Sequence, residues 1–156
     1  MSEAATSFQT AASLYQELVV ERARRPLHGG ELDPADGAGD GTNPLCGDKV
    51  RVSVRFDADH RVAAILHRTR GCAICAASAD LMADSVTGLD EARVESLYGR
   101  FDQLLQQGAD ALEPDGREQL GLLLAFSDLH DYRSRRKCAT LPWSALRAAF
   151  KSAKEP

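Results

Sequence analysis

Three of the four cysteines in this chain stand in distinctive local sequences, and together they constrain how it can fold. Cys46 lies in Asn-Pro-Leu-Cys-Gly-Asp, Cys72 follows a glycine in Gly-Cys-Ala-Ile-Cys, and Cys138 follows basic residues in Arg-Arg-Lys-Cys-Ala-Thr-Leu-Pro-Trp. The motifs are far apart in sequence, and each is expected where a turn meets a regular element. Thiolates placed in this way can converge, and Asp48 accompanies the first of them. Three cysteines and an aspartate suffice to hold a tetrahedral metal ion, or to accept and pass on sulfur.

The length and charge of the chain limit the classes of protein to which it can belong. At 156 residues it is long enough for one domain whose core needs no disulfides. A net charge of -4 argues against binding to nucleic acid through overall charge. No apolar run approaches the ~20 residues of a membrane span, and residues 1–10 lack the pattern of a signal peptide. We therefore expect a cytoplasmic protein with neither nucleic acid nor membrane as a partner.

Cysteines in a cytoplasmic protein are expected to be thiols, metal ligands or redox groups rather than disulfides. Cys72 and Cys75 have the spacing of a thioredoxin-like redox motif or of half a zinc site. The sequence has no second pair with this spacing, so a metal site depends on long-range folding. For Cys75 we expect burial as a small apolar residue, with an alternative ligand or a resolving thiol as the other interpretations.

The pattern of apolar residues predicts an α+β fold. An alternation of apolar and polar residues predicts an antiparallel hairpin at 49–56 and 61–69, preceded by a surface loop at 27–42. Helical spacing of apolar residues predicts helices at 13–25, 73–87 and 90–107, a leucine-rich helical segment at 117–129, and a last helix at 141–151 opened by Pro142. The order is one helix, a small sheet and then several helices, which is typical of α+β rather than βαβ proteins.

Each motif gives its cysteine a local reason to ionise. Gly47 allows the backbone to turn so that Cys46 and Asp48 point the same way. Cys72 lies at the expected start of a helix, where free N–H groups favour a thiolate. The cations that precede Cys138 are expected to lower its pKa. Three buried structural cysteines would not require these neighbours, so the motifs favour a functional site.

These motifs closely resemble those of the iron–sulfur cluster assembly family that comprises IscU, SufU and the N-terminal domain of NifU. The resemblance extends from Leu14 to Ala148. It implies a sandwich in which helices pack on one face of a small antiparallel sheet. It also implies one domain at 13–152, with an insert near 106–119, between an N-terminal tail at 1–12 and a C-terminal tail at 153–156.

Two features resemble SufU more than IscU. Lys137 stands where IscU-type scaffolds carry histidine, and the connection between the second and third cysteines is longer. Similarity to SufU implies a zinc ion held by Cys46, Asp48, Cys72 and Cys138. It also implies that the chain accepts sulfur from a SufS-type cysteine desulfurase and passes it to downstream cluster-assembly proteins.

In this interpretation Cys46 is the persulfide acceptor, released from zinc when the docked desulfurase supplies a replacement ligand. Arg135 matches a basic position of the family. It is a candidate to stabilise a thiolate or persulfide, and equally a solvated surface charge.

Two other functions use the same residues. A non-enzymatic scaffold would assemble a [2Fe–2S] cluster, or bind iron, with Cys46, Cys72 and Cys138 as ligands. A binding module would hold zinc for structure alone. Lys137 and the longer connection favour the sulfur acceptor over the scaffold, and Asp48 argues against a closed structural site. Whether the chain is an enzyme, with sulfurtransferase-like activity, depends on this choice. His67 and His130 lie outside the motifs and are expected to be satisfied in the core or exposed.

Overall fold

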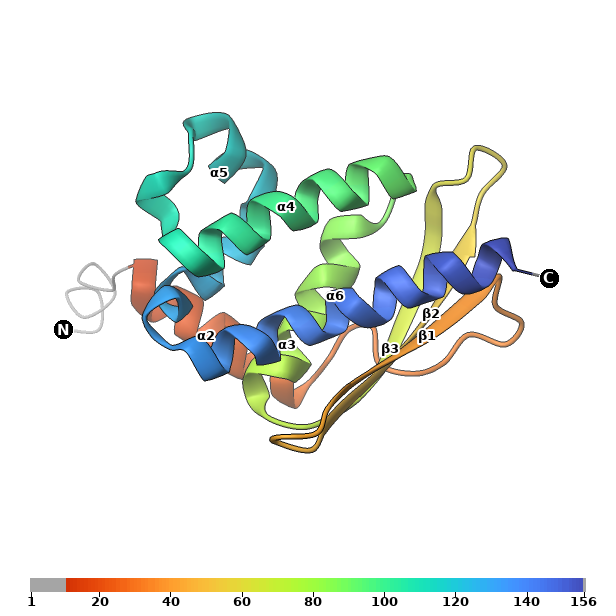
Figure 1. Cartoon of the computed structure of the whole chain (residues 1–156), viewed down its shortest axis with the longest axis horizontal. Coiled ribbons are helices and arrows are strands. Elements are labelled where there is room, and N and C mark those ends of the chain that lie inside the picture. The colour runs from red at the N-terminus through yellow and green to blue at the C-terminus, as the bar shows by residue number, and fades with distance from the viewer. Residues whose placement is uncertain (1–10, 156) are drawn as a thin grey trace, which may run out of the picture.

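A three-stranded antiparallel sheet forms one end of the molecule, and helices form the rest (Figure 1). The computed structural model describes residues 11–155. Its strands are β1 (Gly37–Asn43), β2 (Asp48–Phe56) and β3 (Val62–Arg70). Its helices are α2 (Ala11–Arg24), α3 (Ala73–Val86), α4 (Glu91–Gln107), α5 (Pro114–Leu120) and α6 (Arg133–Lys154), with 3₁₀ segments η1 (Ala109–Ala111) and η2 (Gly121–Asp131).

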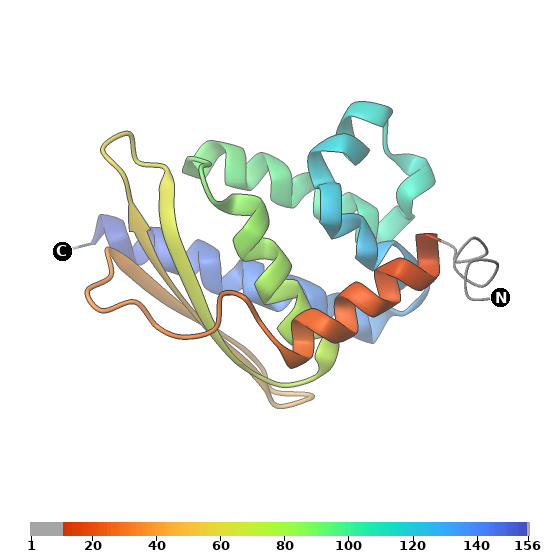
Figure 2. The ribbon, with the colours of Figure 1, turned by 180° about the vertical axis from the view of Figure 1, so that it is seen from behind.

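The sheet has the order β1-β2-β3, and α3 and α6 cover one of its faces (Figures 1 and 2). Val50, Val52 and Val54 of β2 point into this covered face and are buried. The opposite face carries the alternate residues, and the segment between α2 and β1 runs along it (Figure 2). The predicted α+β fold, with helices on one face of a small antiparallel sheet, is therefore confirmed.

The core extends from the sheet into the helices. Its largest fully buried side chains include Trp143, Phe101 and Phe126, whose rings contact one another in series through Phe101. None of the helices within residues 11–155 combines the length and the apolar character needed to cross a membrane. The domain limits at 13–152 and the insert at 106–119 stay predictions. Of the predicted tails, residues 1–10 and 156 lie outside the described part of the chain.

The predicted surface loop at 27–42 is wrong at its end, because Gly37–Asn43 forms the edge strand β1. Its alternate glycines face α6. A Cβ added to Gly37 or Gly39 would overlap the backbone of α6 at Ala149 or Ala145. The glycines that suggested a loop are instead required where a strand and a helix approach closely.

The last helix is longer than predicted. It begins at Arg133 rather than at 141, and Pro142 lies inside it instead of opening it. Proline cannot donate the helical hydrogen bond to the carbonyl of Cys138. The buried side chains that follow, among them Trp143 and Leu146, hold the helix against the sheet and α3 and outweigh this loss.

The leucine-rich segment predicted at 117–129 is helical, but it is not one α-helix. The α-helix ends at Leu120, and Gly121, with φ of 53°, begins a 3₁₀ segment. Leu123, Phe126 and Leu129 bury the inner side of this segment, as its composition suggested.

A buried carboxylate ties the N-terminal helix to the rest of the fold. Asp80 of α3 is fully buried and accepts hydrogen bonds from Arg22 at 2.7 Å and from the backbone N–H groups of Leu27 and His28 at 3.0 and 2.9 Å. His67 Nε2 lies 3.0 Å from the same carboxylate, so this histidine is satisfied in the core as predicted. Burial alone would raise the pKa of Asp80, but these hydrogen bonds together hold it well below its usual range.

We expect Gly39→Ala to lower the free energy of unfolding by about 1–3 kcal/mol, because the new Cβ overlaps the α6 backbone. Gly99→Ala is the matched control, since Gly99 is exposed in α4 with nothing within 4 Å of an added Cβ. Alanine there should stabilise the helix by up to about 1 kcal/mol. Urea unfolding followed by circular dichroism measures both. An unchanged midpoint for Gly39→Ala would contradict the close approach.

The lowered pKa of Asp80 predicts a loss of stability in acid. Because the folded pKa lies below the unfolded value, the carboxylate stabilises the fold above about pH 4, and this contribution disappears as pH falls through the folded pKa. Asp80→Asn should lower the free energy of unfolding by about 3 kcal/mol at pH 7, since Arg22 loses its buried partner. The difference in the free energy of unfolding between the wild type and Asp80→Asn, measured by urea titration, should become smaller towards pH 2. If this difference did not change with pH, the charge of Asp80 would not be what stabilises the fold.

Candidate metal centre

The first motif forms the tight connection between β1 and β2. The side chain of Asn43 accepts a hydrogen bond from the N–H of Leu45 at 3.1 Å, and the Asn43 carbonyl accepts one from Gly47 at 2.7 Å. Gly47 has φ of 78°, the left-handed conformation that the sequence predicted for this turn. Cys46 is exposed at the turn, whereas Asp48 begins β2 and is only 4% exposed.

The second motif places Cys72 at the N-cap of α3. Its Sγ accepts a hydrogen bond from the N–H of Cys75 at 3.4 Å, which is the helix-start environment expected from the sequence. The N–H and the thiol of Cys72 both donate to Asp48, at 3.2 Å to Oδ1 and 3.6 Å to Oδ2. Asp48 therefore joins the first motif to the second.

The third motif differs from its prediction in two respects. Cys138 does not lie at a junction but inside α6, where its thiol donates to the carbonyl of Ser134 at 3.7 Å. Burial, followed by the neighbouring Cys72 thiol and Asp48 carboxylate, raises the pKa of Cys138, whereas the preceding cations were expected to lower it. Of these cations Arg135 and Lys137 are exposed to solvent and Arg136 is half-buried, so the buried environment dominates.

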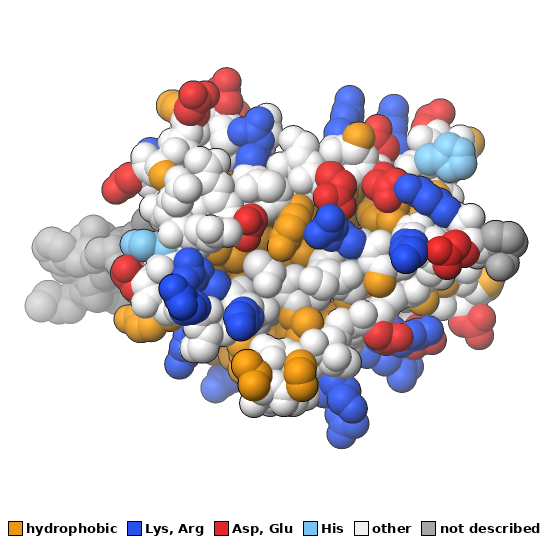
Figure 3. Space-filling view, in the orientation of Figure 1, with side chains coloured by type: hydrophobic (Ala, Val, Ile, Leu, Met, Phe, Trp, Pro, Cys, Tyr) orange, Lys and Arg blue, Asp and Glu red, His pale blue; other side chains and the backbone are white. Residues whose placement is uncertain are grey.

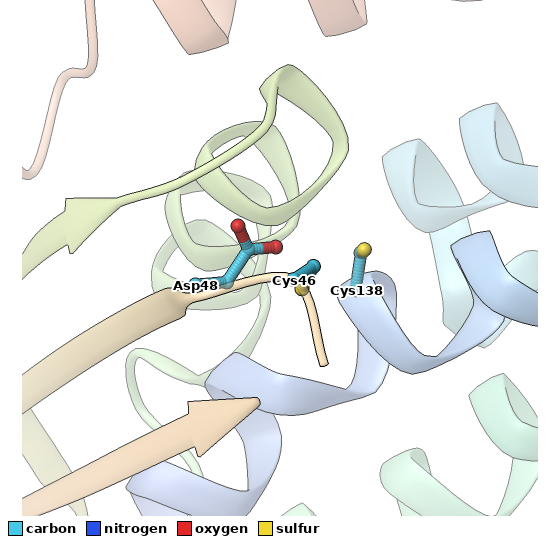
Figure 4. Close-up of side chains that lie close together, drawn as sticks. All are labelled: Cys46, Asp48 and Cys138. Carbon is cyan, nitrogen blue, oxygen red and sulfur yellow. The ribbon is translucent and has the colours of Figure 1, made fainter. Parts of the chain in front are cut away.

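The three segments meet at one point. The Sγ atoms of Cys46 and Cys138 and a carboxylate oxygen of Asp48 all lie within 4.8 Å of one another (Figure 4). The Cys72 thiol lies outside this group of three, but it contacts the Asp48 carboxylate at 3.6 Å. Zinc–sulfur bonds of about 2.3 Å and zinc–oxygen bonds of about 2.1 Å would set tetrahedral ligands roughly 3.5–4 Å apart, so a small contraction would suffice for these three ligands and Cys72 would have to move closer to them.

The donor set fits zinc or iron. Three thiols and one carboxylate are ligands that both metals accept, and a cation would offset the charge that burial disfavours. The structure brings together the residues that the sequence proposed as ligands. Their role as ligands stays a prediction.

Gly71 is a residue whose role in the site the sequence analysis missed. A Cβ at this position would overlap the Asp48 carboxylate, so glycine leaves the space in which Asp48 approaches Cys72. The signal was present in the Gly-Cys motif, but only the fold shows that the glycine serves Asp48.

The site opens into a cleft of about 610 Å³ with a basic wall. Cys46, Cys72 and Cys138 line it together with Arg133, Ser134, Arg135 and Lys137 of α6 and Asn43 and Leu45 of the turn. Lys and Arg side chains gather over the start of α6, beside hydrophobic side chains over the β1–β2 turn (Figure 3). Arg135 thus lies in the cleft with the three cysteines, and its role in stabilising sulfur stays a prediction.

The residues left open by the sequence lie outside this ligand cluster. Cys75 is fully buried one turn into α3, and burial raises its pKa to about 12, which supports a packing role. His67 turns towards Asp80. His130 is exposed, with Nδ1 at 2.9 Å from the carbonyl of Ser127.

A small α+β domain that gathers three cysteines and an aspartate beside a basic cleft is the architecture expected of an iron–sulfur cluster assembly protein. Residues 14–139 match the family model described as the NifU-like N terminal domain. The chain belongs to this family, together with relatives named IscU and SufU, as the resemblance of its motifs predicted.

Two relatives similar to this chain over most of its length carry different functional names. The chain is 33% identical to the iron–sulfur cluster assembly scaffold protein IscU of Streptococcus pyogenes serotype M1, over 88% of this chain and 83% of the relative. It is 31% identical to the zinc-dependent sulfurtransferase SufU of Bacillus subtilis, over 86% of this chain and 87% of the relative.

A solved structure supports the same assignment. A proposed iron–sulfur cluster assembly scaffold protein for the SUF system of Fervidobacterium islandicum AW-1 superposes with a TM-score of 0.76 and 25% identity, over 90% of this chain and 98% of that chain. The comparisons establish that the chain belongs to a family of iron–sulfur cluster assembly proteins. They do not distinguish a scaffold from a sulfur acceptor, so that distinction must be argued from the site.

Gly71→Ala should weaken zinc binding by about tenfold or more, because the methyl group displaces Asp48 from Cys72. Competition with a chromophoric zinc chelator measures the affinity, and Gly99→Ala is again the control. Unchanged affinity in Gly71→Ala, with the fold intact, would show that Asp48 does not contribute to a metal site.

Proposed function

We propose that this protein accepts persulfide sulfur from a cysteine desulfurase and delivers it to downstream cluster-assembly proteins, with zinc as its resident metal. Cys46, Asp48, Cys72 and Cys138 would hold the zinc. The observation that carries the proposal is the asymmetry of the site: Cys46 is exposed on a turn, whereas Asp48 and Cys138 are buried in regular elements. One thiol is thus accessible to a partner while the rest of the site is anchored.

The contacts of the thiols single out Cys46 as the acceptor. Its contact with the Asn43 carbonyl is 3.9 Å long, which is a weak restraint. Cys72 is also exposed, but its thiol group bonds both to Asp48 and to the N–H of Cys75. Cys46 is therefore the thiol that a docked partner can approach with the least disruption.

The transfer itself is a thiol–persulfide exchange. The Cys46 thiolate attacks the outer sulfur of a persulfide on the desulfurase cysteine, a new S–S bond forms and the old one breaks. The desulfurase cysteine leaves as a thiolate and Cys46 carries the persulfide, so no external oxidant or reductant is consumed. Arg135 lines the cleft where the anionic sulfur would lie. When bound, zinc supplies a redox-inert cation that keeps its thiolate ligands deprotonated.

Lys137 favours this function over a scaffold. It precedes Cys138 and lines the same cleft, where a protonated amine cannot ligate a metal. The cleft also leaves room for a partner's cysteine-bearing loop, whereas a purely structural zinc site is usually closed on all sides.

The second candidate is a scaffold that assembles a [2Fe–2S] cluster, or binds iron, on Cys46, Cys72 and Cys138. The name of the streptococcal relative favours it, and thiolates are the usual ligands of such clusters.

Metal analysis combined with a desulfurase assay tests the proposal. We expect stoichiometric zinc in the purified protein and stimulation of a SufS-type desulfurase that falls to background in Cys46→Ser. Cys75→Ala is the matched control, because Cys75 is buried beside the site and should keep the stimulation. Mass spectrometry should find one added sulfur atom on Cys46 after reaction.

Two results would overturn the proposal. A cluster chromophore that survives gel filtration after reconstitution, without zinc, would establish the scaffold. Retained zinc with no stimulation of the desulfurase would establish a structural metal.

A further inference from the structure

The outer face of the sheet is basic at the end nearest the metal centre. The strand register sets Lys49 of β2 opposite Arg70 of β3, and Arg51 opposite Arg68. Members of each pair share a face, because partners in an antiparallel ladder point the same way. We call these four residues the basic sheet end.

The basic sheet end is unfavourable for folding by itself. Like charges directly opposite one another destabilise a pair of strands. Arg51 is neutralised by Asp40 at 2.7 Å and Glu31 at 3.4 Å. Lys49, Arg68 and Arg70 are exposed and form no ion pair within residues 11–155.

The opposite end of the outer face is closed by the chain itself. Ser53 accepts a hydrogen bond from the N–H of Leu32 at 2.9 Å, and Arg55 donates to the carbonyl of Pro34 at 2.6 Å. The segment between α2 and β1 supplies these contacts (Figure 2). The end near the metal centre is open to solvent as far as residues 11–155 show, as a groove of about 350 Å³ lined by the basic sheet end with Asp40, Gly41, Thr42 and Val50.

The groove adjoins the candidate metal centre. Lys49 follows Asp48 in β2, and Arg70 precedes Gly71 and Cys72. A partner seated on the basic sheet end would therefore lie beside the site without entering the cleft that exposes Cys46, since the cleft and the groove share no lining residue.

We propose that the basic sheet end docks an acidic surface of a protein partner whose carboxylates are spaced about 7 Å apart, as at alternate positions of an extended strand. Three of the four cations are arginines, whose guanidinium groups pair with carboxylates through two parallel hydrogen bonds. Such pairs would relieve the repulsion across the strands. This docking goes beyond sulfur acceptance and does not depend on which role the metal centre has.

The groove is less suited to nucleic acid or to a membrane. Its lining contains no aromatic side chain for stacking bases. The side chain of Val50, its apolar lining residue, points into the covered face of the sheet and is buried, so it cannot insert into lipid. A protein surface is therefore the occupant that the charges favour.

The test uses a fluorescein-labelled ten-residue peptide of alternating Glu and Thr as the probe, with binding followed by fluorescence anisotropy. We expect Arg68→Gln/Arg70→Gln to weaken binding at least about tenfold, because two guanidinium–carboxylate pairs are lost. The matched control is Arg93→Gln/Arg117→Gln, which removes the same charge from α4 and α5. Its affinity for the peptide should stay within about twofold of the wild-type value. The wild-type affinity should fall with added salt.

Stability provides a second readout. If the basic sheet end serves docking, Arg68→Gln/Arg70→Gln should leave the urea midpoint unchanged or raise it, because the cross-strand repulsion is reduced. A clear fall in the midpoint would show that the arginines serve the fold.

Three other outcomes would overturn the proposal: no peptide binding by the wild type, equal weakening in the control, or tighter binding of a ten-residue oligothymidylate or of phosphatidylserine vesicles. None of these bears on sulfur acceptance. Conversely, a failure of Cys46 to accept sulfur would leave the peptide result intact.

Discussion

The close approach of α6 to β1 is the contact on which the rest of the structure depends. Gly37, Gly39 and Gly41 present a strand surface without side chains to the helix. Ala145 and Ala149 on the facing side of the helix have small side chains as well. Larger residues on either element would separate them. Because Cys138 lies two turns before Ala145 on the same helix, this contact also sets how near its thiol lies to the β1–β2 turn that carries Cys46.

The electrostatics of the candidate centre follow from that packing. Three thiols and a carboxylate share a partly buried space, and the raised pKa of Cys138 reflects the cost of adding another negative charge there. A bound cation offsets this cost, so the same burial that disfavours free thiolates suits a metal site. The site residues also differ in exposure. Cys46 faces the cleft, whereas Asp48 is buried and accepts hydrogen bonds from Cys72 in the space that Gly71 leaves.

Two open surfaces flank the centre, and they differ in chemistry. The cleft combines the thiols with α6 cations and the exposed side chain of Leu45, which suits a partner that must reach Cys46. The basic sheet end has no thiol and retains an unfavourable charge arrangement. In the proposed function the chain receives sulfur from one partner and passes it to another, and separate surfaces would let two partners bind without competing for the same residues.

The sequence by itself determined which residues are candidates for the site, Cys46, Asp48, Cys72 and Cys138. Local motifs and periodicity also predicted the hairpin of β2 and β3 and the helices α3 and α4. Only the tertiary structure decided that Gly37–Asn43 is a strand, that α6 runs through Pro142, and that the pKa of Cys138 is raised. Glycine and proline read locally as breaks, but packing against α6 and the core outweighs their intrinsic preferences. Likewise, Arg135 and Lys137 lie beside Cys138 in sequence but are exposed to solvent, and the pKa of Cys138 follows the residues that the fold places around it.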